Sequence, residues 1–228
     1  FIPDLLKCWS HDGKVYSLPK DSAVQGVYYN KDMFDEFKVP YPKDNWTWED
    51  FKQTCLLMTR DTKGRPANDP AFDAKSIKQW GCAFLSLHIP SDPTDPWIKS
   101  AVKDPTGSYY TQDQKKVLID EPDMIRLFEM FADLRCKLHG MPSPAEAQGQ
   151  GDQFRAGLVA MTFGHHSTTF FAKQERVRFK YDVTFTPAGP FGQYASVSAS
   201  AFGVTKRAKY PEEGWQWVKF FCSERIQK

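Results

Sequence analysis

The feature that most constrains the fold is a pair of short predicted strands joined by a polar link that contains proline. The first strand covers residues 14–18 and follows an Asp-Gly turn, and the second covers residues 24–29 and runs into a helix that begins near Lys31. Between them, residues 19–22 combine a proline with short polar side chains, which interrupt strand pairing. This arrangement indicates a chain that passes from one lobe of a molecule to another.

Hydrophobic periodicity predicts an alternation of strands and helices along the rest of the chain. The clearest helix covers residues 121–137, where Met124, Leu127 and Phe131 recur at helical spacing after a proline in the first turn. The other predicted helices cover residues 31–37, 47–60, 145–156, 167–174 and 211–222, and further strands cover residues 79–83, 158–162, 181–185 and 200–204. Alternating elements of this kind indicate an α/β fold.

Composition and motifs narrow the function classes. A chain of 228 residues, of which 41% are hydrophobic and 25% charged, can bury a core. Its net charge of +2 comes without a long run of Lys or Arg, which argues against nucleic-acid binding. The sequence lacks an apolar run long enough to span a bilayer, a phosphate-binding glycine loop and the zinc-protease and serine-hydrolase motifs. We therefore predict neither catalysis nor a cofactor.

Five cysteines are widely spaced, at Cys8, Cys55, Cys82, Cys136 and Cys222. They include no Cys-x-x-Cys pair, which argues against a zinc or redox motif. Cys55 and Cys136 fall on apolar faces of predicted helices and are interpreted as small core residues. The sequence leaves open whether any of the five form a disulfide, and which.

Four motifs in order along the chain resemble those of extracellular solute-binding proteins of sugar ABC transporters (family 1 type). They are GKVYSLPKDSAVQGVYYNKDMF from Gly13, NWTWEDF from Asn45, FRAGLVAM from Phe154 and PEEGWQWVKFF from Pro211. In the last motif Gly214 stands where the family usually has alanine. Each motif alone is weak, and their shared order over nearly the whole chain makes the resemblance specific.

The resemblance implies a two-lobed, periplasmic-binding-protein-like (type II) α/β fold with hinge crossings. Residues 1–20 are then expected in the N-terminal lobe, residues 21–186 in the second lobe, and residues 187–228 back in the first. The second crossing is expected at residues 186–190, where the sequence reads Thr-Pro-Ala-Gly-Pro. Because so few residues remain for the first lobe, we expect that lobe to be incomplete and the chain to be an internal fragment.

The function that the resemblance implies is that of the substrate-binding component of an ABC importer. Such a protein binds a carbohydrate in the cleft between its lobes by hinge closure, without catalysis. The expected partners are the ligand and the permease subunits, and the expected form is a periplasmic or extracellular monomer, lipid-anchored through a missing N-terminus. Two alternatives stay open: the same scaffold binding a glycerol phosphodiester or a polyol, and a secreted carbohydrate-active enzyme.

The sharpest candidate binding segment follows the predicted strand 158–162 and comprises His165, His166, Ser167 and Thr168. The end of a strand that opens into a helix N-terminus is a common ligand site in α/β proteins. Imidazoles both donate to and accept from hydroxyl groups and stack on sugar rings. The alternative is a purely structural role, in which Ser167 or Thr168 caps the helix.

The remaining candidates lie at the crossings and after a proline-rich loop. Asp21, Ser22 and Gln25 either bind ligand hydroxyls or satisfy the backbone of the link. Trp97 is a candidate platform for a sugar ring, and Tyr194 and Ser196 are candidate contacts after the second crossing. Trp46 and Trp48 are interpreted as anchors of their helix.

Overall fold

The computed structural model describes residues 3–83, 96–104, 109–111, 113–148, 152–165, 177–195 and 197–227. The chain divides into two compact units: unit 1 comprises Phe1–Val24 and Val197–Lys228, and unit 2 comprises Gln25–Ser196. The polypeptide therefore passes from one unit to the other twice. Among the described residues, no helix combines the length and the apolar character needed to cross a membrane.

The second change of unit comes later in the chain than the boundary that we expected after residue 186. The intervening segment is tied to unit 2 by backbone hydrogen bonds. Ala188 N donates to Trp46 O (2.8 Å), Trp48 N donates to Ala188 O (3.1 Å), and Phe191 N donates to Ser100 O (3.1 Å). These bonds place residues 188–191 against unit 2, so the polar Thr-Pro-Ala-Gly-Pro stretch is not itself the point of passage.

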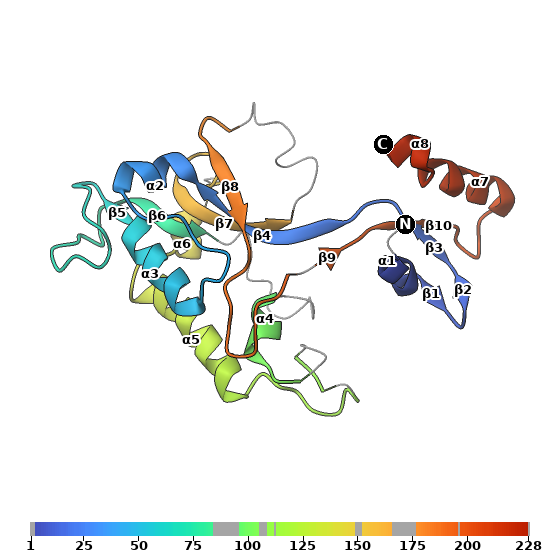
Figure 1. Ribbon diagram of the computed structural model, residues 1–228, viewed down its shortest axis with the longest axis horizontal. Helices are drawn as coiled ribbons and strands as arrows, with labels where there is room; N and C mark the ends of the chain where they lie inside the picture. Colours follow the sequence, from blue (N-terminus) through green and yellow to red (C-terminus); the bar gives the residue numbers. More distant parts are fainter. Residues whose placement is uncertain are drawn as a thin grey trace. The chain divides into compact units, whose positions relative to one another are not determined.

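Unit 2 is built on a mixed sheet with the strand order β5-β6-β7-β4-β8 (Figure 1). Its strands are β4 (Ala23–Asn30), β5 (Arg60–Asp61), β6 (Ile77–Ala83), β7 (Val159–His165) and β8 (Tyr181–Thr184). Strands β6 and β7 run parallel, whereas β4 pairs antiparallel with β7 and β8. The short strand β9 (Val197–Ser198) pairs with the first residues of β4, within unit 1.

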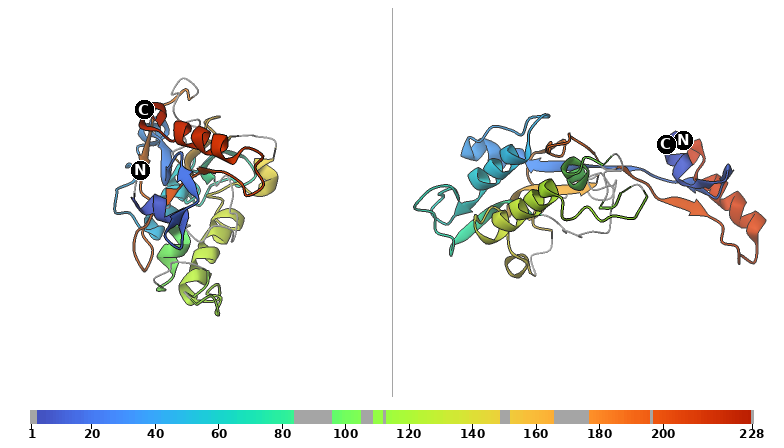
Figure 2. Two further views of the ribbon diagram at one scale, coloured as in Figure 1. Left: turned by 90° about the vertical axis from the view of Figure 1, so that its right-hand side faces the viewer. Right: turned by 90° about the horizontal axis from the view of Figure 1, so that it is seen from below.

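The helices of unit 2 begin where the sequence provides caps. They are α2 (Lys31–Phe37), α3 (Trp48–Met58), α4 (Pro96–Ala101), α5 (Pro122–Cys136) and α6 (Pro144–Ala147). Helix α3 opens with a capping box, in which Thr47 and Asp50 bond each other's backbone N–H groups. Helix α3 packs against β6 and against α5 (Figures 1 and 2).

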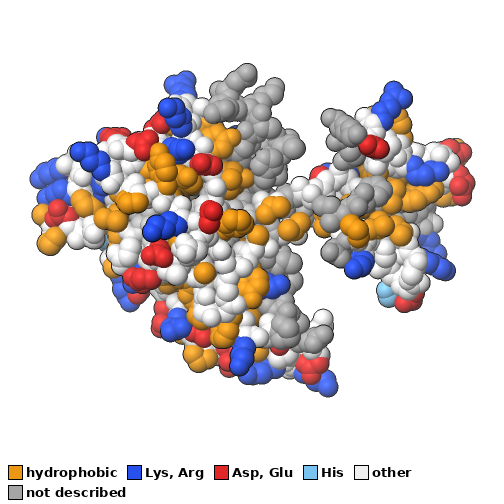
Figure 3. Space-filling model, viewed as in Figure 1, with side chains coloured by type: hydrophobic (Ala, Val, Ile, Leu, Met, Phe, Trp, Pro, Cys, Tyr) orange, Lys and Arg blue, Asp and Glu red, His pale blue; other side chains and the backbone are white. Residues whose placement is uncertain are grey.

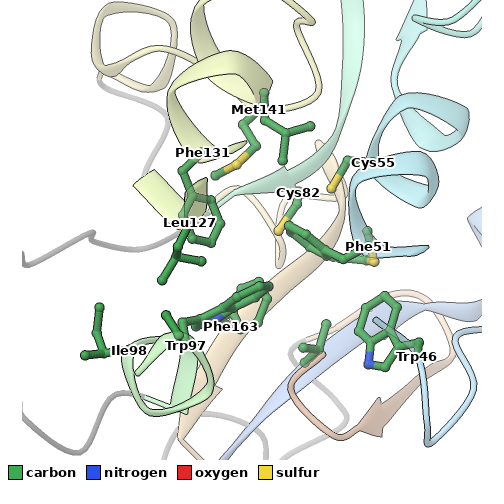
Figure 4. Close-up of a cluster of buried hydrophobic side chains, with 14 of the residues drawn as sticks. Trp46, Phe51, Cys55, Cys82, Trp97, Ile98, Leu127, Phe131, Met141 and Phe163 are labelled. Carbon is green, nitrogen blue, oxygen red and sulfur yellow. The ribbon is translucent and has the colours of Figure 1, made fainter. Parts of the chain in front are cut away.

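Aromatic side chains fill the core between these helices and the sheet. Phe51 lies in contact with Trp46, Trp97 and Phe163, with ring centroids 5.8, 5.2 and 5.5 Å away (Figure 4). Trp46 is buried, and its indole N–H donates to Phe185 O at 2.7 Å. This bond fixes the segment before α3 to the end of β8, which agrees with the interpretation of Trp46 as an anchor.

A buried carboxylate organises the loop between β5 and β6. Asp61 accepts hydrogen bonds from the backbone N–H groups of Lys63, Arg65 and Asp73 and from the Arg65 guanidinium, at 2.7–3.1 Å. Burial alone would raise the pKa of Asp61, but these hydrogen bonds outweigh burial and lower it well below its usual range. The side chain is therefore ionised in the folded protein at neutral pH.

The described part of unit 1 combines short strands with three helices. A turn at Asp12 and Gly13, both with positive φ, joins β1 (Ser10–His11) to β2 (Lys14–Val15) in a hairpin. Strand β3 (Ser17–Pro19) pairs antiparallel with β10 (Ala201–Gly203). The helices that complete the unit are α1 (Pro3–Cys8), α7 (Pro211–Phe221) and α8 (Glu224–Gln227).

Apolar side chains lie at the surface of unit 1 (Figure 3). Trp217 of α7 stacks on Phe221, with ring centroids 4.2 Å apart, and contacts Phe202 of β10. Nevertheless, 50% of Trp217 is exposed, and Val15 is exposed to a similar degree. Leu18 and Phe202 are half-buried.

Several predicted elements are confirmed, and others are wrong. The helices expected at residues 31–37, 47–60, 121–137 and 211–222 are present with small differences at their ends. The helix expected at residues 145–156 is wrong: α6 ends at Ala147, and residues 153–157 form turns. Glycines at positions 149, 151 and 157 disfavour a helix there. The helix expected at residues 167–174 lies outside the described residues.

Of the two cysteines that we interpreted as core residues, one is buried and the other is exposed. Cys55 is fully buried in the core of unit 2, as expected. Cys136 is exposed, so its interpretation as a core residue is wrong. It is the last residue of α5, where the side chain lies beyond the helix face formed by Met124, Leu127 and Phe131.

Candidate functional site

The pairing of β4 with β7 brings two predicted site residues together in unit 2. Gln25 pairs with His165, Gly26 with Gly164, and Val27 with Phe163. The backbones of Gln25 and His165, distant in sequence, are therefore neighbours at the end of β7.

The absence of a side chain at Gly26 permits this end of the sheet to pack closely. A Cβ atom at Gly26 would lie 2.8 Å from Val183 Cγ2 of the neighbouring strand β8, which is too close for an undisturbed contact. The sheet position next to Gln25 thus favours glycine. Four other candidates lie outside the described residues: His166, Ser167, Thr168 and Ser196.

Asp21 and Ser22 belong to unit 1, and both are exposed. The Asp21 carboxylate accepts from Ser200 N at 2.9 Å and contacts the Lys20 ammonium. The hydrogen bond from Lys20, assisted by that from Ser200, lowers the pKa of Asp21 against the opposing effect of burial. Asp21 is therefore an ionised group that both joins the two chain segments of unit 1 and keeps acceptor sites for a ligand, because a carboxylate has about four lone-pair positions.

Trp97 occupies the position of a core side chain rather than of a platform. Only 3% of it is exposed, and its ring packs edge-on against Phe131 and Phe163, each with a centroid separation of 5.0 Å (Figure 4). A sugar ring needs an open aromatic face, and the neighbouring rings leave almost no surface for one. Trp97 is therefore a core residue that anchors α4, and we do not include it among the proposed ligand contacts.

Tyr194 lies beside α4 and is half-buried. Its hydroxyl donates to Phe191 O at 2.8 Å, and the Lys99 ammonium lies 5.2 Å from the centre of its ring. A cation at this distance from an aromatic ring is attracted to its face. Lys99 was missed in the sequence, although its place two residues after Trp97 in a predicted binding loop was an available signal.

A hollow of about 320 Å³ opens in unit 2 where α4 ends and α5 begins. Its lining includes Lys103, Asp104, Glu121, Asp123 and Phe191. None of the predicted site residues lines it, although Phe191 also accepts the hydrogen bond from Tyr194. The volume is at the lower end of the range for small-molecule sites, which is roughly 300–1,000 Å³.

Metal-binding chemistry finds no support among the described residues. In that part of the chain, no group of three or more His, Cys, Asp or Glu side chains is placed to hold an ion. The groups described above are hydrogen-bonding side chains and the aromatic ring of Tyr194.

Comparison with known proteins gives the family. The whole chain, residues 1–228, matches the family described as bacterial extracellular solute-binding protein. The chain belongs to this family. It is 24% identical to the multiple sugar-binding protein of Streptococcus mutans over 227 residues, which cover 94% of this chain and 49% of that protein.

Solved structures with bound ligands share the fold, among them the following two. The substrate-binding protein Lmo0181 of Listeria monocytogenes, in complex with cycloalternan, superimposes with a TM-score of 0.77 at 23% identity, over 98% of this chain and 52% of that one. A solute-binding protein of Agrobacterium vitis with bound D-mannitol gives a TM-score of 0.69 at 16% identity, over 98% and 51%. The chain thus spans about half the length of the relatives that it matches.

These comparisons confirm the family and the fold class that the four motifs predicted. The fold is the two-lobed α/β fold of sugar-binding proteins, and half of that fold is accounted for by this chain. Proteins of this family bind solutes and are not enzymes, which removes the carbohydrate-active enzyme as an alternative. The family is extracellular.

Proposed function

We propose that the protein is the carbohydrate-binding component of an ABC importer. The observation that supports this most strongly is the match of the entire chain to an extracellular solute-binding family. The ligands of its relatives support the carbohydrate class: one relative is named for multiple sugars, and one structure of the same fold holds cycloalternan.

The proposed mechanism is binding by closure of two lobes on the ligand, without chemistry. The chain passes twice between its compact units, so changes in a few backbone torsions at those passages suffice to move one lobe relative to the other. The residues that we propose as ligand contacts are Asp21, Ser22, Gln25, His165, His166, Ser167, Thr168, Tyr194 and Ser196.

Each proposed contact has a chemical reason. The ionised Asp21 accepts hydrogen bonds from neighbouring hydroxyls, and the Gln25 amide both accepts and donates. Tyr194, with Lys99 held over its ring, offers an aromatic edge and a charged donor near each other. These groups suit vicinal hydroxyls, which act as donors and acceptors at once.

We also propose the partners and the location that such a protein needs. The permease subunits of the importer would receive the ligand-bound form, and the protein would act as a monomer. It would work outside the cytoplasmic membrane, in the periplasm or at the cell surface, where a lipid anchor would hold it near its permease.

A polyol is the second candidate ligand. The D-mannitol bound to a protein of the same fold favours it. Polyols and sugars present similar rows of hydroxyls, but a polyol lacks the ring face that stacks on aromatic side chains. An aromatic side chain that contributes to binding therefore favours a carbohydrate.

A thermal-shift screen of the full-length protein tests the proposal. The panel contains maltose, maltotriose, cycloalternan, D-mannitol and glycerophosphocholine. A ligand at 100 times its Kd stabilises the folded state by about 2.7 kcal/mol, which is readily measured. We expect a shift with at least one oligosaccharide. A shift with D-mannitol alone would favour the polyol, and a shift with glycerophosphocholine alone would contradict the carbohydrate class.

A matched pair of variants then tests the site. Gln25→Ala should weaken binding of the oligosaccharide identified in the screen by about 1 kcal/mol, the typical net worth of a hydrogen bond. Gln53→Ala, on the exposed side of α3, is the control and should leave binding unchanged. Equal affinities for both variants would remove the β4–β7 end from the site.

A further inference from the structure

We propose that Cys55 and Cys82 form a disulfide that ties helix α3 to strand β6 in the core of unit 2. The inference is independent of the ligand. Both residues are fully buried in the same hydrophobic cluster. Figure 4 shows Cys55 and Cys82 as neighbours in this cluster, and their thiols interact with each other.

The backbone around the two cysteines is drawn together by Thr59, the residue that follows α3. Its hydroxyl donates to Cys55 O at 2.9 Å and accepts from Gly81 N at 2.8 Å. Cys82 N, one residue further along β6, donates to Gly140 O at 3.2 Å. A single hydroxyl therefore bridges Cys55 to the residue that precedes Cys82.

The two cysteines are free thiols in the structure, and Gly81, which has no side chain, lets strand β6 approach Cys55 closely. A Cβ atom at Gly81 would lie 2.5 Å from Cys55 Cα and 2.1 Å from Cys55 O. Since consecutive Cα atoms are about 3.8 Å apart, Cys82 Cα lies about 8 Å at most from Cys55 Cα. This upper limit includes the separation of roughly 4.4–6.8 Å that a disulfide requires between its Cα atoms.

The environment of the pair determines when the bond forms. Burial raises the pKa of the Cys55 thiol well above its usual value, and contact with the Cys82 thiol raises it further. A protonated, enclosed thiol is unreactive, because the thiolate is the nucleophile. Oxidation must therefore precede closure of the core, while α3 and β6 are still accessible during folding outside the cytoplasm.

The reaction is a thiol–disulfide exchange with a disulfide oxidant, such as oxidised glutathione or a thiol oxidoreductase. The S–H bonds of Cys55 and Cys82 break, and one S–S bond forms between them. The two electrons reduce the disulfide of the oxidant, and the two protons go to its thiolates. An extracellular family works where such oxidants persist.

The other cysteines have different surroundings. Cys8 and Cys136 are exposed. Cys222 is buried in unit 1, where its thiol donates to Leu18 O at 3.6 Å. Among the described residues, Cys55 and Cys82 are thus the two that share one buried core cluster.

Alkylation and peptide mapping test the proposal. The full-length protein is refolded with oxidised and reduced glutathione, denatured without reductant in iodoacetamide, and digested. We expect the peptides of Cys55 and Cys82 to be joined, unalkylated and lighter by two hydrogen atoms, while Cys136 is alkylated. Alkylation of Cys55 and Cys82 to the same extent as Cys136, or their linkage to other cysteines, would overturn the proposal.

A second measurement separates the bond from the packing of the two side chains. The unfolding temperature of the oxidised protein should fall when dithiothreitol is present during the scan. The double variant Cys55→Ala/Cys82→Ala should show no such fall, whereas Cys136→Ala should behave like the wild type. An equal response to dithiothreitol in the wild type and the double variant would contradict the bond.

Discussion

Replacement of Trp97 by alanine separates a core role from a ligand-binding role more sharply than any other change. The side chain is 3% exposed and contacts the rings of Phe51, Phe131 and Phe163. An aromatic side chain buries about 150–250 Å². At about 25 cal/mol per Å², this burial contributes about 4–6 kcal/mol.

Measured costs of Trp→Ala in cores, about 3–5 kcal/mol, include the cavity that remains. We therefore expect Trp97→Ala to lower the free energy of unfolding by about 4 kcal/mol. Such a loss is a large part of the stability of a typical domain, which is about 5–15 kcal/mol. Trp97→Phe retains an aromatic ring and should cost clearly less.

Urea unfolding followed by circular dichroism is the suitable assay, because tryptophan fluorescence changes with the substitution itself. Tyr110→Ala is the control, since that aromatic side chain is about half exposed and belongs to the same unit. Its expected cost is well below that of Trp97→Ala. A loss below about 1 kcal/mol for Trp97→Ala, together with weaker oligosaccharide binding, would refute the core assignment.

Further predictions concern backbone caps, glycines and acid stability, all measured by urea unfolding. Thr47→Ala removes the capping box of α3 and should cost about 1 kcal/mol, and an unchanged midpoint would show that the cap is dispensable. Gly81→Ala places a Cβ atom 2.1 Å from Cys55 O and should cost at least about 1–3 kcal/mol. Gly214 lies in α7, and a Cβ atom there would meet only Val204, at 3.4 Å; Gly214→Ala should therefore stabilise by up to about 1 kcal/mol, and the opposite order would contradict the packing described. Because the folded pKa of Asp61 is depressed, its contribution is present at neutral pH and is lost as pH falls below about 4. Asp61→Asn should therefore make the free energy of unfolding depend less on pH below about 4. The same decrease at low pH in the variant and the wild type would count against this role of Asp61.

The sequence predicted those elements whose signals are local. The ends of α3 follow from Thr47, Asp50 and the apolar spacing behind them, all visible within a few residues. The same periodicity failed for Cys136, because this residue lies off the buried face of α5, which includes Met124, Leu127 and Leu134. Trp97 was likewise misjudged, since its burial depends on Phe51, Phe131 and Phe163, which come from distant segments.

In the candidate site, too, local signals were predicted from the sequence and contacts between distant segments were not. Gln25 and His165 were each selected from their local surroundings, but their pairing is a property of strand register, which the sequence did not specify. Lys99 was missed because its position over the ring of Tyr194 requires the segment around residues 188–194 to return to α4. Contacts between segments far apart in sequence are decided by packing, which short motifs do not report.

Isothermal titration calorimetry of the full-length protein with an oligosaccharide from the screen tests the central claim most directly. We expect saturable binding of one ligand per chain, with a negative heat-capacity change from apolar burial, and recovery of the oligosaccharide chemically intact. Heat that continues after saturation, with shorter sugars in the recovered sample, would contradict a binding protein and indicate an enzyme.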